Sequence, residues 1–190
     1  MDENNKFAIN GDVDHLQIIV DPSAGIDRNL YFITSFAVMA ADKTSVITGC
    51  EWFSNEATDE PLVSLIVTHI KKCRESSEFI ERAEVHLIID SLIPSIVRDI
   101  QKKLTSVKGF YSCVFFTPMG DKRRDGIEDL KNAMKEKKLA FYSNFISVSH
   151  IDVNTEFKRQ LNGYIGYKTQ QNSDCINALI LGFTESQVLV

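Results

Sequence analysis

The chain has 190 residues, of which 44% are hydrophobic and 25% are charged, and its formal net charge is −5 at pH 7. This size and composition are typical of one globular domain with a sizeable core. No apolar run reaches the roughly 18 residues that a membrane helix needs, and the first residues lack a secretory signal pattern, so we expect an intracellular protein with no membrane partner.

The first third of the chain predicts three consecutive strands. Residues 15–21 form a short apolar run that ends in an Asp-Pro pair, and proline restricts the residue before it to extended geometry. Two further runs, 31–41 and 44–53, are rich in β-branched and aromatic residues. We therefore expect a meander of three strands, the first of which ends at Asp21.

Helices and strands alternate through the middle of the chain. Residues 58–76 predict an amphipathic helix with Thr58 or Asp59 as its N-cap and a proline in its first turn. The elements that follow are a strand at 84–90, a helix at 91–104, a strand at 111–118 and a helix at 123–138. This order predicts an α/β fold, with a mixed central sheet of antiparallel meander plus parallel strands, flanked by helices.

The last part of the chain predicts four more elements. They are a short strand at 139–143, a further strand at 145–150, a short helix at 152–164 and a last helix at 173–186. In the last helix Ser173 is the expected N-cap and Asp174 the first residue. We expect one domain over residues 15–190, preceded by a polar N-terminal extension at 1–14.

Three aspartates lie where a predicted hydrophobic element ends or a helix begins: Asp21, Asp90 and Asp174. Each has an ordinary explanation alone, as a turn former before proline, a helix cap and a first-turn charge. Together they predict a metal site, because carboxylates at a sheet rim suit Mg²⁺ or Mn²⁺. Two such ions held close together are typical of phosphodiester chemistry.

The distribution of the basic residues is more informative than their number, because a net charge of −5 argues against a uniformly basic surface. Most basic clusters are typical of solvated helix faces. Lys122, Arg123 and Arg124 follow a predicted strand in a turn-like segment, so we favour them as contacts to a DNA backbone over a solvent-facing helix start. The four cysteines and four histidines show no spacing typical of a zinc site.

The order of elements and the places of the three acids resemble the ribonuclease H-like nuclease superfamily. Within it, the chain is most similar to the C-terminal nuclease domain of the large terminase subunit of tailed phages and herpesviruses. The passages that carry this likeness are Asp-Pro-Ser-Ala-Gly at 21–25, the segments 117–124 and 135–143, and an acid-initiated helix with the pattern D-x-x-x-A-L at 174–179. One departure is Ser91-Leu92 after the second acid, which is often glutamate in the family.

The resemblance implies a metal-dependent endonuclease that cleaves double-stranded DNA with two Mg²⁺ or Mn²⁺ ions. It implies that Asp21 bridges the ions, Asp90 completes the first and Asp174 the second. No GxxxxGK[ST] motif is present, so the implied partners are packaging-motor subunits and an ATPase domain outside this chain. The implied compartment is the host nucleus for a herpesvirus-like protein and the host cytoplasm for a phage protein. The alternatives are a Holliday-junction resolvase-like nuclease and a catalytically inactive, nuclease-like assembly module.

Overall fold

Strands and helices account for most of the chain that the computed structural model describes, which is residues 6–24, 30–54, 61–89, 94–106, 113–116, 123–146 and 174–188. The strands are β1 (Lys6–Phe7), β2 (Val13–Ala24), β3 (Leu30–Met39), β4 (Ser45–Ser54), β5 (Glu84–Ile89), β6 (Cys113–Phe116) and β7 (Leu139–Ile146). The helices are α1 (Leu62–Glu75), α2 (Glu78–Glu81), α3 (Pro94–Thr105), α4 (Arg123–Lys135) and α6 (Asp174–Val188). No described helix is long and apolar enough to cross a membrane.

Within the described ranges, the strands form one sheet in the order β1-β7-β4-β3-β2-β5-β6. The strands β2, β3 and β4 are an antiparallel meander. All the other pairs, β2 with β5, β5 with β6, β4 with β7 and β1 with β7, are parallel. The predicted mixed sheet flanked by helices is therefore confirmed.

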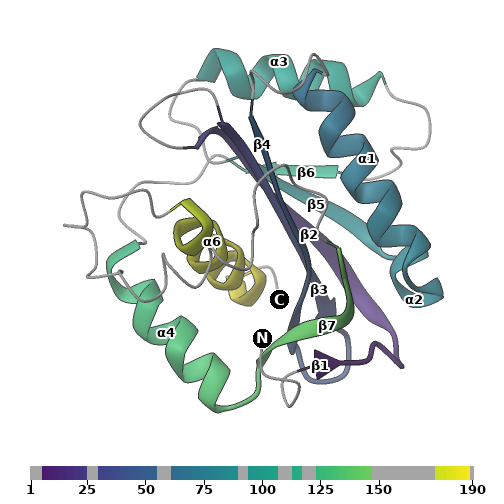
Figure 1. Cartoon of the computed structure of the whole chain (residues 1–190), viewed down its shortest axis with the longest axis vertical. Coiled ribbons are helices and arrows are strands. Elements are labelled where there is room, and N and C mark those ends of the chain that lie inside the picture. Colours follow the sequence, from purple (N-terminus) through teal and green to yellow (C-terminus); the bar gives the residue numbers. More distant parts are fainter. Residues whose placement is uncertain are drawn as a thin grey trace.

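Helices cover both faces of the sheet (Figure 1). One face packs against α1 and α3, and the other against α4 and α6. Side chains of β2 alternate between these layers, so Leu16, Ile18 and Val20 are buried on the α1 side and Ile19 on the α6 side. Burial on both faces explains why the central strands have near-continuous apolar sequences.

A buried polar network joins α1 to the sheet. Oε2 of Glu51 on β4 lies 2.5 Å from Nδ1 of His69 on α1, and Oε1 accepts a hydrogen bond from Nζ of Lys72 at 2.8 Å. On the other side of the imidazole, Nε2 lies 2.9 Å from Oγ of Ser35, which also accepts a hydrogen bond from Oγ1 of Thr48 at 2.7 Å. This network fixes the position of α1 by directional contacts, in addition to the apolar stripe of the helix.

Besides small shifts at the ends of several elements, four features differ from the sequence-based expectation. The first strand does not end at the Asp-Pro pair, because β2 continues to Ala24 through a register shift after Asp21. Proline has no N–H to donate and is tolerated at such a bulge. The helix α1 has Pro61 as its N-cap in place of Thr58 or Asp59, both of which lie outside the described residues.

The other two differences concern strands. Part of the expected polar extension belongs to the sheet, since β1 pairs with β7 and β2 begins at Val13. The two strands expected at 139–143 and 145–150 are one strand, β7, as far as Ile146. The helix expected at 152–164 lies outside the described residues.

Candidate active site

Asp21 lies near the C-terminal end of β2, in the middle of the sheet. Its Cα pairs with that of Phe32 on β3, and its side chain is half-buried. Alternation along the strand places Asp21 on the same face as Ile19, which packs under α6. The bulge that follows Asp21 changes the course of the strand at this point. The carboxylate therefore lies at the rim of the sheet, where a cation can reach it.

The strand β5 brings the second predicted ligand to the same edge. It runs parallel to β2, and Ile89 pairs with Val20. Asp21 follows Val20 in the sequence, and Asp90 follows Ile89. Neighbouring strands lie about 4.8 Å apart, so the end of β5 delivers the chain close to Asp21. Asp90 itself lies outside the described residues.

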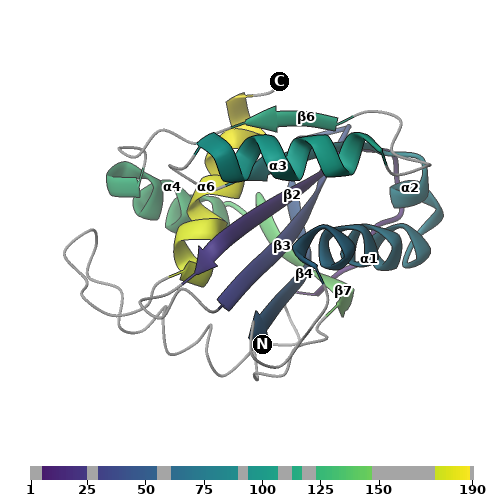
Figure 2. The same ribbon diagram turned by 90° about the horizontal axis from the view of Figure 1, so that it is seen from above.

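The helix α6 carries the third predicted ligand, Asp174, as its first residue, as predicted from the sequence. The side chain of Asp174 is outside the described part of the structure. The helix packs against β2 and β3, and Figure 2 shows the arrowhead of β2 beside the end of α6 that lies away from the C-terminus. The structure thus brings the first turn of α6 towards the edge where β2 ends.

A glycine sets the close approach of α6 to the sheet. A Cβ atom at Gly182 would overlap the ring of Phe36 and would lie 2.6 Å from Cδ1 of Ile19. Gly182 is eight residues after Asp174 in the sequence, which corresponds to about 12 Å along a helix. Ile19 is two residues before Asp21, so the packing at Gly182 places the start of α6 relative to Asp21.

The predicted DNA-binding residues flank the start of α4. Arg123 is the first residue of this helix and Arg124 the second, but their side chains are outside the described part of the structure, and so is all of Lys122. The helix packs against α6 and β7, and Figure 1 shows α4 and α6 beginning at the same side of the molecule. The two arginines therefore enter the fold on the side where α6 begins.

Within the described residues, no three His, Cys, Asp or Glu side chains are grouped so that they could hold a metal ion. Of the three predicted ligands, only the side chain of Asp21 is described.

The Glu51–His69 pair, which lies on the opposite face of the sheet, was not predicted from the sequence. Across the sheet, Glu51 on β4 is the register partner of Ile33 on β3, and Ile33 is the register partner of Val20 on β2, which directly precedes Asp21. The sequence signal that could have revealed the pair is a charged residue inside an apolar strand.

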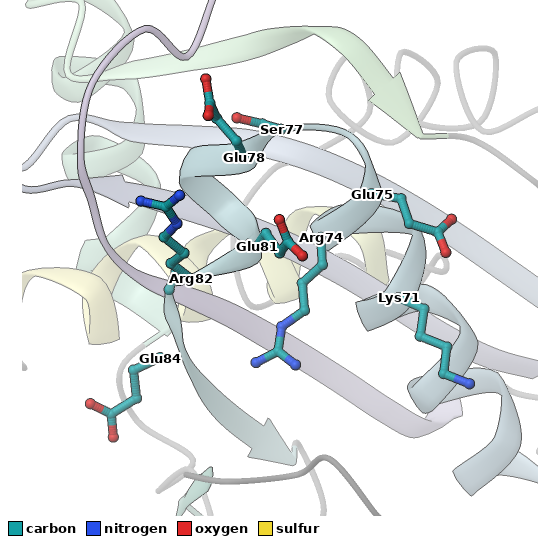
Figure 3. Close-up of a pocket in the computed structure, with 9 residues that line it drawn as sticks. Lys71, Arg74, Glu75, Ser77, Glu78, Glu81, Arg82 and Glu84 are labelled. Carbon is teal, nitrogen blue, oxygen red and sulfur yellow. The ribbon is translucent and has the colours of Figure 1, made fainter.

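A pocket of about 720 Å³ lies at the other end of β5, where the strand begins at Glu84 (Figure 3). Side chains of both charge signs line it, including Lys71 and Arg74 from α1 and Glu81 from α2. The strand β5 is six residues long, which separates the pocket from Ile89 by about 17 Å. Its mixed charges offer no concentrated positive surface for phosphate, and we assign it no part in the candidate site.

Comparison with known proteins rests on structure, since no family model and no curated protein sequence matches the chain. The Mn-soaked human cytomegalovirus terminase nuclease domain superposes with a TM-score of 0.72 at 14% identity, covering 95% of this chain and 86% of that one. The large terminase of a thermophilic bacteriophage gives a TM-score of 0.56 at 13% identity, and the match covers 100% of this chain but 43% of that one.

The chain has a ribonuclease H-like fold. The resemblance predicted from the order of elements is thereby confirmed at the level of the fold. In this ribonuclease H-like fold β2, β5 and α6 occupy adjacent positions, and these are the elements that carry, or directly precede, the three predicted acids. At identities of 13% and 14% the likeness concerns the fold, and the chemistry is argued from the residues of this chain.

Proposed function

We propose that the chain is a divalent-metal-dependent endonuclease that cleaves double-stranded DNA by two-metal phosphodiester hydrolysis. The observation that carries this proposal is the half-buried Asp21 at the end of β2, beside the parallel strand that leads into Asp90 and under the helix that begins at Asp174. In this proposal the end of β2, the end of β5 and the start of α6 bring the three carboxylates to one edge of the sheet.

The donor set fits Mg²⁺ or Mn²⁺. All three groups are carboxylates, and hard cations of this kind prefer oxygen ligands. When bound, a pair of such ions activates the attacking water and stabilises the leaving oxygen of a phosphodiester. In this proposal Asp21, Asp90 and Asp174 would hold the two ions, with Asp21 as the ligand that both ions share. The positive end of the α6 dipole favours an ionised Asp174 at the helix start.

The remaining roles fall to the basic residues and to the surrounding elements. Lys122, Arg123 and Arg124 hold the DNA backbone, since guanidinium and ammonium groups bind phosphate oxygens without reading sequence. The apolar side chains on the same face of the sheet as Asp21, which include Ile19, Phe32 and Ile88, are buried and would keep water from the base of the site. The likeness to terminase nuclease domains supports a place in a DNA-packaging motor, beside an ATPase carried outside this sequence.

Cleavage of supercoiled plasmid tests the proposal. We expect nicking with millimolar Mn²⁺ that falls to background once excess EDTA is added, and we expect Asp21→Asn to abolish nicking. The matched control is Asp12→Asn, because Asp12 is an exposed aspartate near the opposite end of β2. Equal activity of the two variants would exclude Asp21 from the chemistry. A four-way junction cut in preference to linear duplex would favour a resolvase, and a folded protein that never cuts would favour an assembly module.

A further inference from the structure

A second group of buried polar side chains lies on the α6 side of the sheet. His15 and Gln17 on β2 are 2% and 0% exposed, and His86 on β5 is half-buried. Four polar atoms of this His15–Gln17–His86 cluster have no hydrogen-bond partner among the described residues: Nε2 of His15, Oε1 and Nε2 of Gln17, and Nδ1 of His86. A buried polar atom without a partner destabilises the fold, and a ligand that binds such atoms would remove this cost.

The sheet places these three side chains next to one another. The Cα atoms of Gln17 and His86 are register partners on neighbouring parallel strands, and His15 is two residues from Gln17 on the same face. The imidazole rings of His15 and His86 are stacked, with centroids 4.3 Å apart and an angle of 17° between their planes. These three side chains therefore lie side by side on one face of the sheet.

A carboxylate lies beside the outer nitrogen of each imidazole. Oδ2 of Asp14 is 3.1 Å from Nδ1 of His15, and Oε1 of Glu84 is 3.8 Å from Nε2 of His86. The Asp14 carboxylate accepts a hydrogen bond when His15 carries its proton on Nδ1. In that neutral tautomer the lone pair is on the buried Nε2. Histidines that bind metals show this pattern of a carboxylate on the far nitrogen.

We propose that His15, Gln17 and His86 form a binding site for a transition-metal cation of the Zn²⁺ type. The ligand atoms are Nε2 of His15, Nδ1 of His86 and Oε1 of Gln17, which together supply the nitrogen and oxygen donors that Zn²⁺ accepts. Three protein ligands leave one position open for water. The rings turn out of their stack when the ion binds, because stacked rings hold their lone pairs parallel.

The site is separate from the candidate active site, since Gln17 is four residues from Asp21 along β2, a span of about 13 Å. It therefore stands whether or not the proposed nuclease activity is correct.

Titration of the metal-free protein with Zn²⁺ and Co²⁺ tests the proposal. We expect visible absorption bands of tetrahedral Co²⁺, with Zn²⁺ displacing Co²⁺, and we expect His86→Gln to weaken Zn²⁺ binding at least about tenfold. Gln17→Leu retains the volume of the side chain and should weaken binding as well. Asp21→Asn is the control for the other site, and it should leave the Co²⁺ bands unchanged.

Imidazole ¹⁵N resonances of the wild-type protein give a readout that needs no variant. One equivalent of Zn²⁺ should shift Nε2 of His15 and Nδ1 of His86 and leave both nitrogens of His69 in place. Unshifted resonances would overturn the proposal and would mean that buried water alone occupies the cluster. Co²⁺ bands that disappear in Asp21→Asn but persist in His86→Gln would overturn it too, because the ion would then belong to the candidate active site.

Discussion

The carboxylate of Glu51 and the imidazole of His69 form an ion pair with an N–O distance of 2.5 Å, and neither side chain has any exposed surface. The pair joins β4 to α1, so a charged contact lies between a strand and a helix that otherwise pack through apolar side chains. Lys72 completes the charge balance from the surface, with its side chain 30% exposed. The three residues form one unit, because Glu51 is the shared acceptor.

Replacing the shared acceptor should destabilise the protein strongly. Glu51→Gln leaves the buried imidazole without its carboxylate, and breaking a buried pair by removing one partner costs about 3–5 kcal/mol. For a chain of this size that corresponds to a fall in Tm of roughly 6–20 °C. Thermal unfolding followed by circular dichroism measures it.

The matched control is the exposed pair Lys103–Asp99, whose N–O distance of 2.6 Å is similar to that of the buried pair but whose side chains are each 58% exposed. An exposed pair contributes about 0–1 kcal/mol, so Asp99→Asn should change the Tm little. Similar shifts in the two variants would mean that the network around Glu51 adds no more than a surface pair.

The same network makes stability depend on alkaline pH. Burial lowers the pKa of His69, but Cys73 and Glu51 raise it by more, to about 10. In the unfolded chain a histidine has a pKa of about 6.5, so between these values the folded state holds a proton that the unfolded state releases. The contribution of His69 is complete below about pH 6.5 and is lost as the pH rises through about 10.

Urea unfolding at pH 7 and pH 10 measures this dependence. The free energy of unfolding should fall with pH in the wild-type protein, and the fall should be smaller by about 1 kcal/mol or more in His69→Gln. The variant controls for the titrating groups that lie away from His69, whereas the pKa values of Cys73 and Glu51 rise in the variant because His69 lowers both. A parallel decline in the two would show that His69 holds no proton in this range.

The sheet and its helices could be predicted from the sequence, because the spacing of hydrophobic residues and the presence of turn-forming residues are local signals. The same applies to the start of α6, where an acid at a helix start was recognisable at Asp174. The Glu51–His69 pair was not predictable, since the two residues are 18 positions apart and no motif joins them. Only the packing of α1 on this face shows that Glu51 is buried.

The end of the first strand shows where a local rule fails. Proline after Asp21 predicts a strand end, yet pairing with β3 resumes at Ala24 because a bulge accommodates the missing N–H. The places of Asp21, Asp90 and Asp174 in the order of elements were recognisable from the sequence, and their role as metal ligands stays a prediction. The buried His15–Gln17–His86 cluster was not recognisable, because its members come together only through the register of β2 and β5.

The close approach at Gly182 predicts a second packing variant. Gly182→Ala adds a Cβ atom that meets the ring of Phe36 and Cδ1 of Ile19, both of which are fully buried and cannot move aside. Overpacking of this kind costs about 1–3 kcal/mol, which exceeds the gain of up to about 1 kcal/mol from the higher helix propensity of alanine. We expect a lower Tm by differential scanning calorimetry.

Gly11→Ala provides the matched control, since a Cβ atom at Gly11 would make only an ordinary contact with Cε of Met39 at 3.9 Å. This variant should be as stable as the wild type or slightly more so. If Gly182→Ala is also neutral, α6 can move away from β2, and the packing at Gly182 does not set the position of Asp174.

Metal ions should stabilise the folded protein through Asp21. In the proposed site the carboxylates of Asp21, Asp90 and Asp174 repel one another without a cation, and a ligand that binds only the folded state at 100 times its Kd adds about 2.7 kcal/mol. We therefore expect saturating Mn²⁺ to raise the Tm by roughly 5–10 °C. Asp21→Asn should abolish this rise, whereas Asp12→Asn should retain it because Asp12 is exposed near the opposite end of β2. An undiminished shift in Asp21→Asn would place the Mn²⁺ site away from the end of β2.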